Sequence, residues 1–264
     1  MAEVVANPVI ERFAAGEVAL GMLVRIVRTP DVARVAKATG HDFLFVDLQH
    51  SLFGLETLGA IAQTALGVGV APIVRVRSVV DPDVSVLLDN GVSGVVFPDV
   101  ETAEEAEQAV AVAKFAPLGR RSITGGLPAF DYRPVPQRES MALMNARTLC
   151  VCMIETVRGL ENAEAIAAVE GVDVLHMGTS DLLADMGKPG EFDHPEIVMA
   201  QERVIEAAHL HGKVAGCGGN RSVERQAAIV DKGVRFLTTQ ADFAFLASAA
   251  GAWTRGIREH ISRQ

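Results

Sequence analysis

Several features that define large classes of protein are missing from this sequence of 264 residues. No run of about 18 apolar residues occurs, so no segment is expected to cross a membrane. There is no basic arm, and the formal net charge of −9 argues against a nucleic-acid surface. The N-terminal segment lacks the charged-then-apolar order of a signal peptide. We therefore expect neither nucleic acid nor a membrane as a partner.

Cysteine is also scarce. The three cysteines, Cys150, Cys152 and Cys217, are too few for a disulfide framework. Cys150 and Cys152 would share one face of a strand, and packing in a core explains them better than metal binding. These observations favour a reducing, cytoplasmic location. The glycine-rich fingerprints G-x-G-x-x-G and G-x-x-x-x-G-K are absent as well, which leaves nucleotide binding with little support.

The sequence does contain a regular alternation of apolar, β-branched runs and helical patterns. Runs that are apolar almost throughout are typical of parallel strands covered on both faces. The eight runs that we interpret as strands are residues 21–26, 43–47, 72–76, 94–97, 149–155, 172–178, 213–217 and 235–240. Eight such alternations without a long linker predict a single (β/α)8 TIM barrel over residues 1–264, a length typical of that fold.

Start and stop signals support the helices between these strands. Thr29 followed by Pro30 predicts a cap with proline at the first helical position. Thr102 with Glu105 predicts a capping box. Glycines in the left-handed conformation are expected at the ends of five helices, at Gly40, Gly91, Gly171, Gly212 and Gly233.

One connection is longer than the others. Between the fourth and fifth strands we expect a helix at 102–114 and another at about 137–147, so that residues 115–148 form a loop and helix insertion. Its middle is rich in Gly, Pro and Arg. Because long loops in compact domains are usually functional or disordered, we expect an ordered loop over the barrel mouth.

Active sites of TIM barrels lie at the carboxyl ends of the strands, so the polar residues at those ends are the candidates. Glu155 and Asp181 follow the fifth and sixth strands, which are neighbours in a barrel. Two carboxylates that leave several positions open suit a hard divalent cation such as Mg or Mn. The alternative is structural: Asp181 as a helix cap and Glu155 in a salt bridge.

A second pair follows the second strand. Asp47 ends the strand and His50 comes three positions later, where a carboxylate would orient the imidazole and raise its basicity. Arg75 ends the third strand, and a buried guanidinium there needs an anion from the protein or from a substrate. Arg77 is the alternative to Arg75.

Lysine is nearly absent from the strand ends. Of the five lysines, Lys188 alone lies in a loop that approaches the expected mouth. A Schiff-base enzyme places a desolvated lysine on or near a strand end. The sequence therefore argues against covalent imine chemistry.

These motifs resemble one known family. The segments FVDLQHS, PIVRV, GRRSITGG, MIETVRGLEN, GTSDLLADMG and DHPE are similar to those of the class II pyruvate aldolases of the HpcH/HpaI family, and the likeness runs from about residue 18 to 250. The combination of I-E-T, G-x-x-D-L-x-x-D-M-G and a D-x-x-H-like arrangement is specific. The resemblance implies a (β/α)8 barrel that reversibly cleaves 4-hydroxy-2-oxo acids to pyruvate, or an analogue such as hydroxypyruvate, and an aldehyde.

The resemblance also implies a divalent metal cofactor, Mg, Mn or Co, and a homo-oligomer, a hexamer built as a trimer of dimers. By position, Glu155 and Asp181 match the metal ligands, His50 the acid–base histidine and Asp47 its acidic partner. Arg75 matches the arginine that stabilises the enolate oxygen. The backbone amides of Gly178, Thr179 and Ser180 match the loop that holds the 2-oxo acid carboxylate, and free N–H groups at a helix start do attract anions.

Two further positions concern the second substrate. Arg25, with Arg28 nearby, lies at the end of the first strand, where a carboxylate of the aldehyde partner would fit, although surface arginines paired with acids are an equal alternative. Gln49 stands where related sequences often have Glu. Two other functions stay open: an acyl-CoA lyase like the citrate lyase β-subunit or malyl-CoA lyase, and a non-catalytic barrel that binds a 2-oxo acid.

Overall fold

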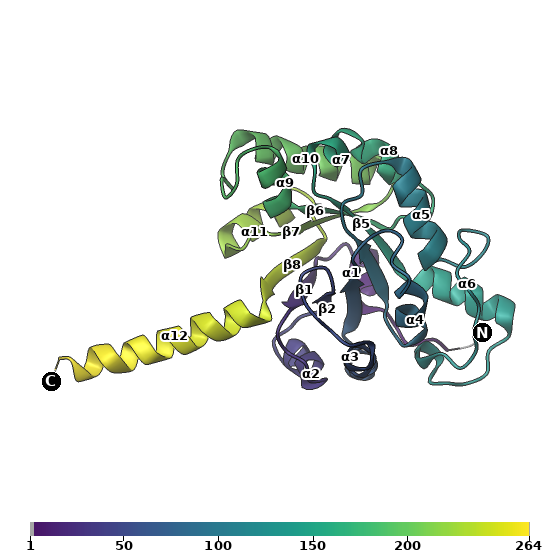
Figure 1. Cartoon of the computed structure of the whole chain (residues 1–264), viewed down its shortest axis with the longest axis horizontal. Coiled ribbons are helices and arrows are strands. Elements are labelled where there is room, and N and C mark those ends of the chain that lie inside the picture. Colours follow the sequence, from purple (N-terminus) through teal and green to yellow (C-terminus); the bar gives the residue numbers. More distant parts are fainter. Residues whose placement is uncertain (1–2, 264) are drawn as a thin grey trace.

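The computed structural model describes residues 3–263, and it contains a closed barrel of eight parallel strands in sequential order (Figure 1). The predicted (β/α)8 barrel is confirmed, and no strand end is displaced by more than two residues. The strands are β1 (Ala19–Val24), β2 (Phe43–Asp47), β3 (Ala71–Arg75), β4 (Gly94–Phe97), β5 (Leu149–Ile154), β6 (Val174–Gly178), β7 (Val214–Gly218) and β8 (Phe236–Ala241).

Helices surround the barrel. They are α1 (Pro8–Ala14), α2 (Asp31–Ala38), α3 (Leu55–Val68), α4 (Val84–Asp89), α5 (Ala103–Ala113), α6 (Gln137–Arg147), α7 (Val157–Glu161), α8 (Ala163–Ala168), α9 (Thr179–Asp185), α10 (Pro195–Leu210), α11 (Val223–Asp231) and α12 (Asp242–Ile261), with a short 3-10 turn at Pro128–Phe130. The predicted capping box of Thr102 and Glu105 is present at the start of α5. The predicted cap at Thr29 is wrong by one residue, because α2 begins at Asp31 after Pro30.

Two apolar layers hold the barrel together. Large side chains that point inward fill the barrel interior. Near the amino-terminal ends of the strands, the rings of Phe43 and Phe236 stack with their centroids 4.4 Å apart. Helix α1, which the sequence did not predict, packs Val9 and Phe13 against this interior layer. A second layer lies between the outer faces of the strands and the helices. All five predicted left-handed glycines have positive φ, from 65° at Gly212 to 121° at Gly233.

The insertion between α5 and β5 is ordered, but its predicted position over the barrel mouth is wrong. The Val5 N–H donates to Ala129 O at 2.8 Å, and the Arg147 guanidinium donates to Val5 O at 2.7 Å. Pro128 lies beside Gly91, just before β4 begins. The insertion therefore covers the amino-terminal side of the barrel. The reason is topological: α5 returns the chain to that side, and β5 starts from it.

Helix α12 leaves the barrel. It projects from the end of β8 as a long arm in Figure 1 and does not lie along the barrel wall. Of its residues 242–261, Asp242 alone is buried. Within residues 3–263, no helix combines the length and apolar character that crossing a bilayer requires.

Candidate active site

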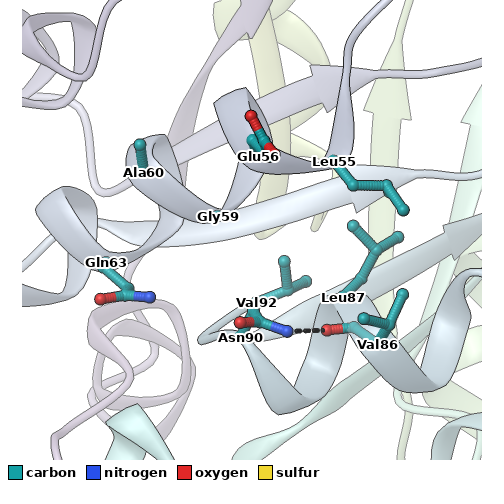
Figure 2. Close-up of a pocket in the computed structure, with 9 residues that line it drawn as sticks. All are labelled: Leu55, Glu56, Gly59, Ala60, Gln63, Val86, Leu87, Asn90 and Val92. Carbon is teal, nitrogen blue, oxygen red and sulfur yellow. Dashed lines mark hydrogen bonds between the residues drawn. The ribbon is translucent and has the colours of Figure 1, made fainter.

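A small cavity of about 140 Å³ opens at the carboxyl ends of the strands. It differs from two roomier hollows on the outside of the molecule. One, of about 550 Å³, lies between α3 and α4 and is lined mostly by apolar residues, with Glu56, Gln63 and Asn90 as the polar ones (Figure 2). The other, of about 610 Å³, is almost wholly apolar and lies between α2 and α12. The first is lined by one titratable residue and the second by three, whereas the strand-end cavity is lined by eight.

Seven of the eight strands, or the turns that follow them, contribute to the wall of the strand-end cavity. Among its lining residues are eight that the sequence predicted: Arg25, Asp47, His50, Arg75, Glu155, Gly178, Ser180 and Asp181. Lysine is not among the lining residues, and Lys188 instead pairs with Glu196 at 2.9 Å.

Asp47 and Arg75 form the rigid centre of this wall. The two residues stand side by side in the β2–β3 register, and both are buried. Arg75 Nε donates to Asp47 Oδ1 at 3.0 Å, and Nη2 donates to Oδ2 at 2.9 Å. A two-point pair of this kind fixes the orientation of the guanidinium as well as its charge. The anion that the sequence required for Arg75 is therefore Asp47.

The same carboxylate shapes the loop after β2. Asp47 Oδ1 accepts hydrogen bonds from the backbone N–H groups of Gln49 at 3.1 Å and His50 at 3.2 Å. Arg25 Nη2 donates to the His50 carbonyl at 3.1 Å from the neighbouring strand. The His50 backbone is thus held from two sides at the cavity edge.

Glu155 is 2% exposed, and its surroundings change its pKa strongly. Burial raises the pKa of its carboxyl to about 8; Arg75 opposes that rise, and the negative charges of Asp99 and Asp181 add to it. Its Oε1 accepts from the Asp99 N–H at 3.2 Å. A Cβ on residue 178 would come within 2.5 Å of Oε2, so the close approach of Glu155 to β6 requires the glycine found there.

The turn from β6 into α9 brings backbone N–H groups to the same place. Gly178 precedes the helix, and no side chain caps it. The first N–H groups of a helix have no partner within it, so this end is open to a negatively charged ligand. Asp181 lies in the first turn and lines the cavity.

The chemistry of these donors fits a hard divalent cation. Besides Asp47, which is paired with Arg75, the carboxylates of Glu155 and Asp181 line the cavity. Burial is the main cause that raises the pKa of Glu155, and repulsion from Asp181 adds to it. A cation between them would remove that repulsion. Within residues 3–263, no group of three His, Cys, Asp or Glu side chains is arranged to hold a metal ion. Glu155 and Asp181 could thus supply two ligands to a divalent cation, with the remaining positions taken by substrate and water.

The sequence comparisons agree with this geometry. The family model described as HpcH/HpaI aldolase/citrate lyase matches residues 22–243. The chain belongs to the HpcH/HpaI aldolase/citrate lyase family. A 4-hydroxy-4-methyl-2-oxoglutarate aldolase of Chaetomium globosum is 41% identical over 92% of each chain. A hydroxypyruvate/pyruvate aldolase of Cupriavidus necator is 31% identical over 97% of this chain and 94% of the relative.

Solved structures give the same result. The crystal structure of an HpcH/HpaI aldolase from Desulfitobacterium hafniense superposes with a TM-score of 0.91 at 30% identity, covering 96% of this chain and 98% of that one. The predicted family and reaction class are thus confirmed: this HpcH/HpaI protein is an aldolase, a carbon–carbon lyase.

Some predicted contacts of this HpcH/HpaI site are not found. Asp47 was expected to orient the His50 imidazole, but it bonds the His50 backbone, and within residues 3–263 the imidazole makes no hydrogen bond. Arg77, the alternative to Arg75, lies outside the cavity and pairs with Asp81 and Asp83 at 3.1 Å each. Both differences follow from register, since Arg75 is the residue directly opposite Asp47.

Three other predicted residues lie at the margin. The Thr179 side chain is buried against Cys217, with its Oγ1 3.4 Å from the Cys217 Sγ, so only its backbone can serve the cavity. Gln49 is not in the wall; its Nε2 donates to Asp99 Oδ2 at 3.4 Å. Arg28 stacks 3.7 Å from the centre of the Phe53 ring, outside the cavity.

The sequence interpretation gave no role to three residues of the site. Asp99, at a left-handed φ of 52°, directs its N–H toward Glu155. His176 lies on β6 at the base of the cavity, and Arg221 lies after β7. Asp99 follows β4 closely enough to meet the strand-end criterion, but its sequence context suggested no role. His176 points inward from mid-strand, so it did not meet the strand-end criterion. The predicted seventh strand ended at residue 217, one residue before β7 ends, which left Arg221 four residues beyond it.

Proposed function

We propose that the enzyme cleaves 4-hydroxy-2-oxo acids to pyruvate, or to a close analogue such as hydroxypyruvate, and a carbonyl compound. The observation that carries the proposal is the single cavity in which Glu155 and Asp181 face the Asp47–Arg75 pair and His50. The substrates named for the relatives from C. globosum and C. necator belong to the same chemistry. An acyl-CoA lyase is less well supported, because these relatives at 31–41% identity are named aldolases.

Glu155 and Asp181 would hold the divalent cation, which we propose to be Mg, Mn or Co. When bound, such a cation supplies Lewis-acid stabilisation of negative charge on the 2-oxo oxygen. The backbone N–H groups of Gly178, Thr179 and Ser180 would hold the carboxylate of the 2-oxo acid at the start of α9. Arg75, fixed by Asp47, places a positive charge beside the same oxygen without any rearrangement during the reaction.

His50 completes the reaction. Its imidazole takes the proton of the 4-hydroxyl, directly or through a water, as the bond between C3 and C4 breaks. The electron pair of that bond enters the enolate, C4 becomes a carbonyl carbon, and C3 is then protonated to give the 2-oxo acid. Among residues 3–263 no lysine lines the cavity, so its wall offers no side-chain amine for an imine.

The test is pyruvate release from a panel of 4-hydroxy-2-oxo acids, with and without EDTA and with Mg, Mn or Co added back. We expect EDTA to abolish activity, and Glu155→Gln and Asp181→Asn each to weaken binding of Mn²⁺ in a direct titration. His50→Ala should lower kcat by about 10²–10⁴-fold. Full activity in EDTA, or an adduct trapped by borohydride and pyruvate on Lys188, would refute the mechanism.

We also propose that the enzyme is a homo-oligomer, with the hexamer of the family resemblance as the specific expectation. Large apolar side chains on the projecting α12 support it, among them Leu246, Trp253, Ile257 and Ile261. The apolar hollow between α2 and α12 adds a surface of matching character. A reducing compartment such as the cytoplasm is likewise a proposal, and the three free cysteines fit it.

A further inference from the structure

Arg221 is an arginine of the cavity wall without a carboxylate partner. It follows β7, and its Nη1 donates to the neutral Gln240 Oε1 at 3.0 Å. Within residues 3–263 it forms no ion pair, whereas Arg75 is paired with Asp47 and nearby Arg225 is paired with Asp193. A guanidinium that lines a cavity and lacks a counter-charge can bind an anion.

The surroundings of Arg221 increase its demand for negative charge. Arg221 is exposed as a whole residue, but partial burial of its guanidinium lowers its pKa, and repulsion from Arg25 and Arg75 lowers it further. Asp47, the acid whose charge acts on Arg221, already receives two hydrogen bonds from Arg75, and its Oδ2 lies 3.5 Å from Arg25 Nε. Three guanidiniums thus share one carboxylate on this side of the cavity.

The loop that carries Arg221 is firmly anchored. Gln226 Nε2 donates to Asn220 O at 2.7 Å and to Thr239 O at 2.8 Å, which ties the loop to β8. Gly219 has a φ of 85°, and a Cβ there would lie 2.9 Å from Ser180 Oγ, so the loop packs directly on the start of α9. A fixed backbone places Arg221 beside the end of the cavity that would hold the 2-oxo acid carboxylate.

Strand order then gives the position of Arg221 along a bound substrate. The order β6, β7, β8, β1, β2 runs around the barrel from the α9 turn to His50. Arg221 after β7 and Arg25 after β1 stand between the place of the first carboxylate and the histidine that meets the 4-hydroxyl. A group attached to the hydroxyl-bearing carbon would face these two arginines.

We propose that Arg221, assisted by Arg25, binds a second carboxylate on the carbon that carries the hydroxyl, so that the substrates are dianionic 4-carboxy-4-hydroxy-2-oxo acids. This inference rests on the proposed aldol cleavage and specifies its substrate class. Cleavage breaks the C3–C4 bond, the 4-hydroxyl proton goes to His50, and C4 becomes the keto carbon of a second 2-oxo acid. Both products are therefore 2-oxo acids, and protonation of the enolate at C3 completes the balance.

The first arm of the test measures binding without turnover. 2-Oxoglutarate carries the second carboxylate in the proposed position and has no hydroxyl to cleave, and 2-oxopentanoate lacks that carboxylate. Calorimetry with Mn²⁺ present should show tighter binding of 2-oxoglutarate to the wild type. Arg221→Gln should lower its affinity about 10- to 100-fold and leave that of 2-oxopentanoate unchanged. Arg221→Lys should restore part of the loss, and Arg225→Gln, which removes a nearby paired arginine, should have no effect.

The second arm measures cleavage of 4-hydroxy-4-methyl-2-oxoglutarate and 4-hydroxy-2-oxopentanoate. Arg221→Gln should lower kcat/KM for the first by the same factor and change the second less than about threefold. The inference is overturned if the wild type does not prefer the dianions, or if Arg221→Gln keeps that preference. If no substrate is cleaved with Mg, Mn or Co, the proposed cleavage is refuted instead. The binding arm does not depend on cleavage, so the two failures can be told apart.

Discussion

At the scale of single residues, the two arginines of β3 and its turn should behave differently. Arg75 grips Asp47 through two nitrogens, and Arg77 forms ion pairs outside the cavity. Lysine keeps the charge but has no planar fork for a two-point contact. We expect Arg75→Lys to lower kcat/KM at least about 100-fold and Arg77→Lys to change it less than about threefold. Steady-state kinetics of both variants test this expectation. A larger loss in Arg77→Lys than in Arg75→Lys would show that Arg77, not Arg75, stabilises the enolate oxygen.

His176 governs a different property, the stability of the barrel in acid. It is 1% exposed, and burial, with Arg75 adding to the effect, lowers its pKa to about 3. In the folded protein the His176 imidazole therefore stays neutral down to about pH 3, whereas in the unfolded chain it takes up a proton below a pH of about 6.5. Stability is retained above that pH and is lost as the pH falls.

For this histidine we expect the free energy of unfolding of the wild type to fall by about 2 kcal/mol more than that of His176→Phe between pH 7 and pH 5. Urea unfolding at both pH values measures the difference. His209→Phe, which replaces an exposed histidine, should follow the wild type. Equal pH dependence of wild type and His176→Phe would show that His176 is not buried as a neutral group.

At the scale of elements, one carboxylate fastens the loop after β1. Asp242, the first residue of α12, accepts hydrogen bonds from the backbone N–H groups of Arg25, Ile26 and Val27 at 2.8–3.1 Å. Asp242→Ala leaves these donors without their acceptor and should destabilise the protein by about 2–4 kcal/mol. Exposed Asp231→Ala should cost less than about 0.5 kcal/mol in the same urea titration.

The elements themselves were largely predictable, and the reasons are local. Each strand has a continuous apolar run, and Thr102 with Glu105 carries its own cap. The insertion was misplaced because its loop chemistry does not encode which end of the barrel it covers. Helix α1 was missed because seven residues, of which Val9 alone is buried, give too little periodic signal.

The site residues were also predictable in part: their positions could be predicted, but their contacts could not. Asp47, Arg75 and Glu155 end or directly follow strands, so topology alone brought them together. The partner of each group was less predictable: Asp47 bonds Arg75 because of the β2–β3 register, which the sequence does not state. Arg221 depends on a turn at Gly219 that no periodic pattern reveals.

At the scale of the whole molecule, the arm α12 predicts assembly. Trp253 is the chain's single tryptophan and is 76% exposed on this arm. In an oligomer it should be covered, so its emission should shift to the red and acrylamide should quench it more strongly as the protein is diluted. Sedimentation velocity over the same concentrations should show dissociation.

Two variants sharpen that experiment. Ile257→Glu places a charge on α12 and should favour the monomer, whereas Met199→Glu places one on an exposed apolar position of α10 and should not. A wild type that sediments as a monomer at micromolar concentration, with Trp253 fully open to quencher, would contradict the proposed oligomer.

The hydrogen bonds of Asp242 join the loop after β1 to helix α12. One carboxylate holds the loop of Arg25 at the cavity and also begins the arm that is proposed to meet a second copy. A shift of the arm therefore acts on the loop, and ordering of the loop acts on the arm. Under that proposal the affinity for substrate and the affinity between subunits are linked equilibria, and each must change the other by the same factor.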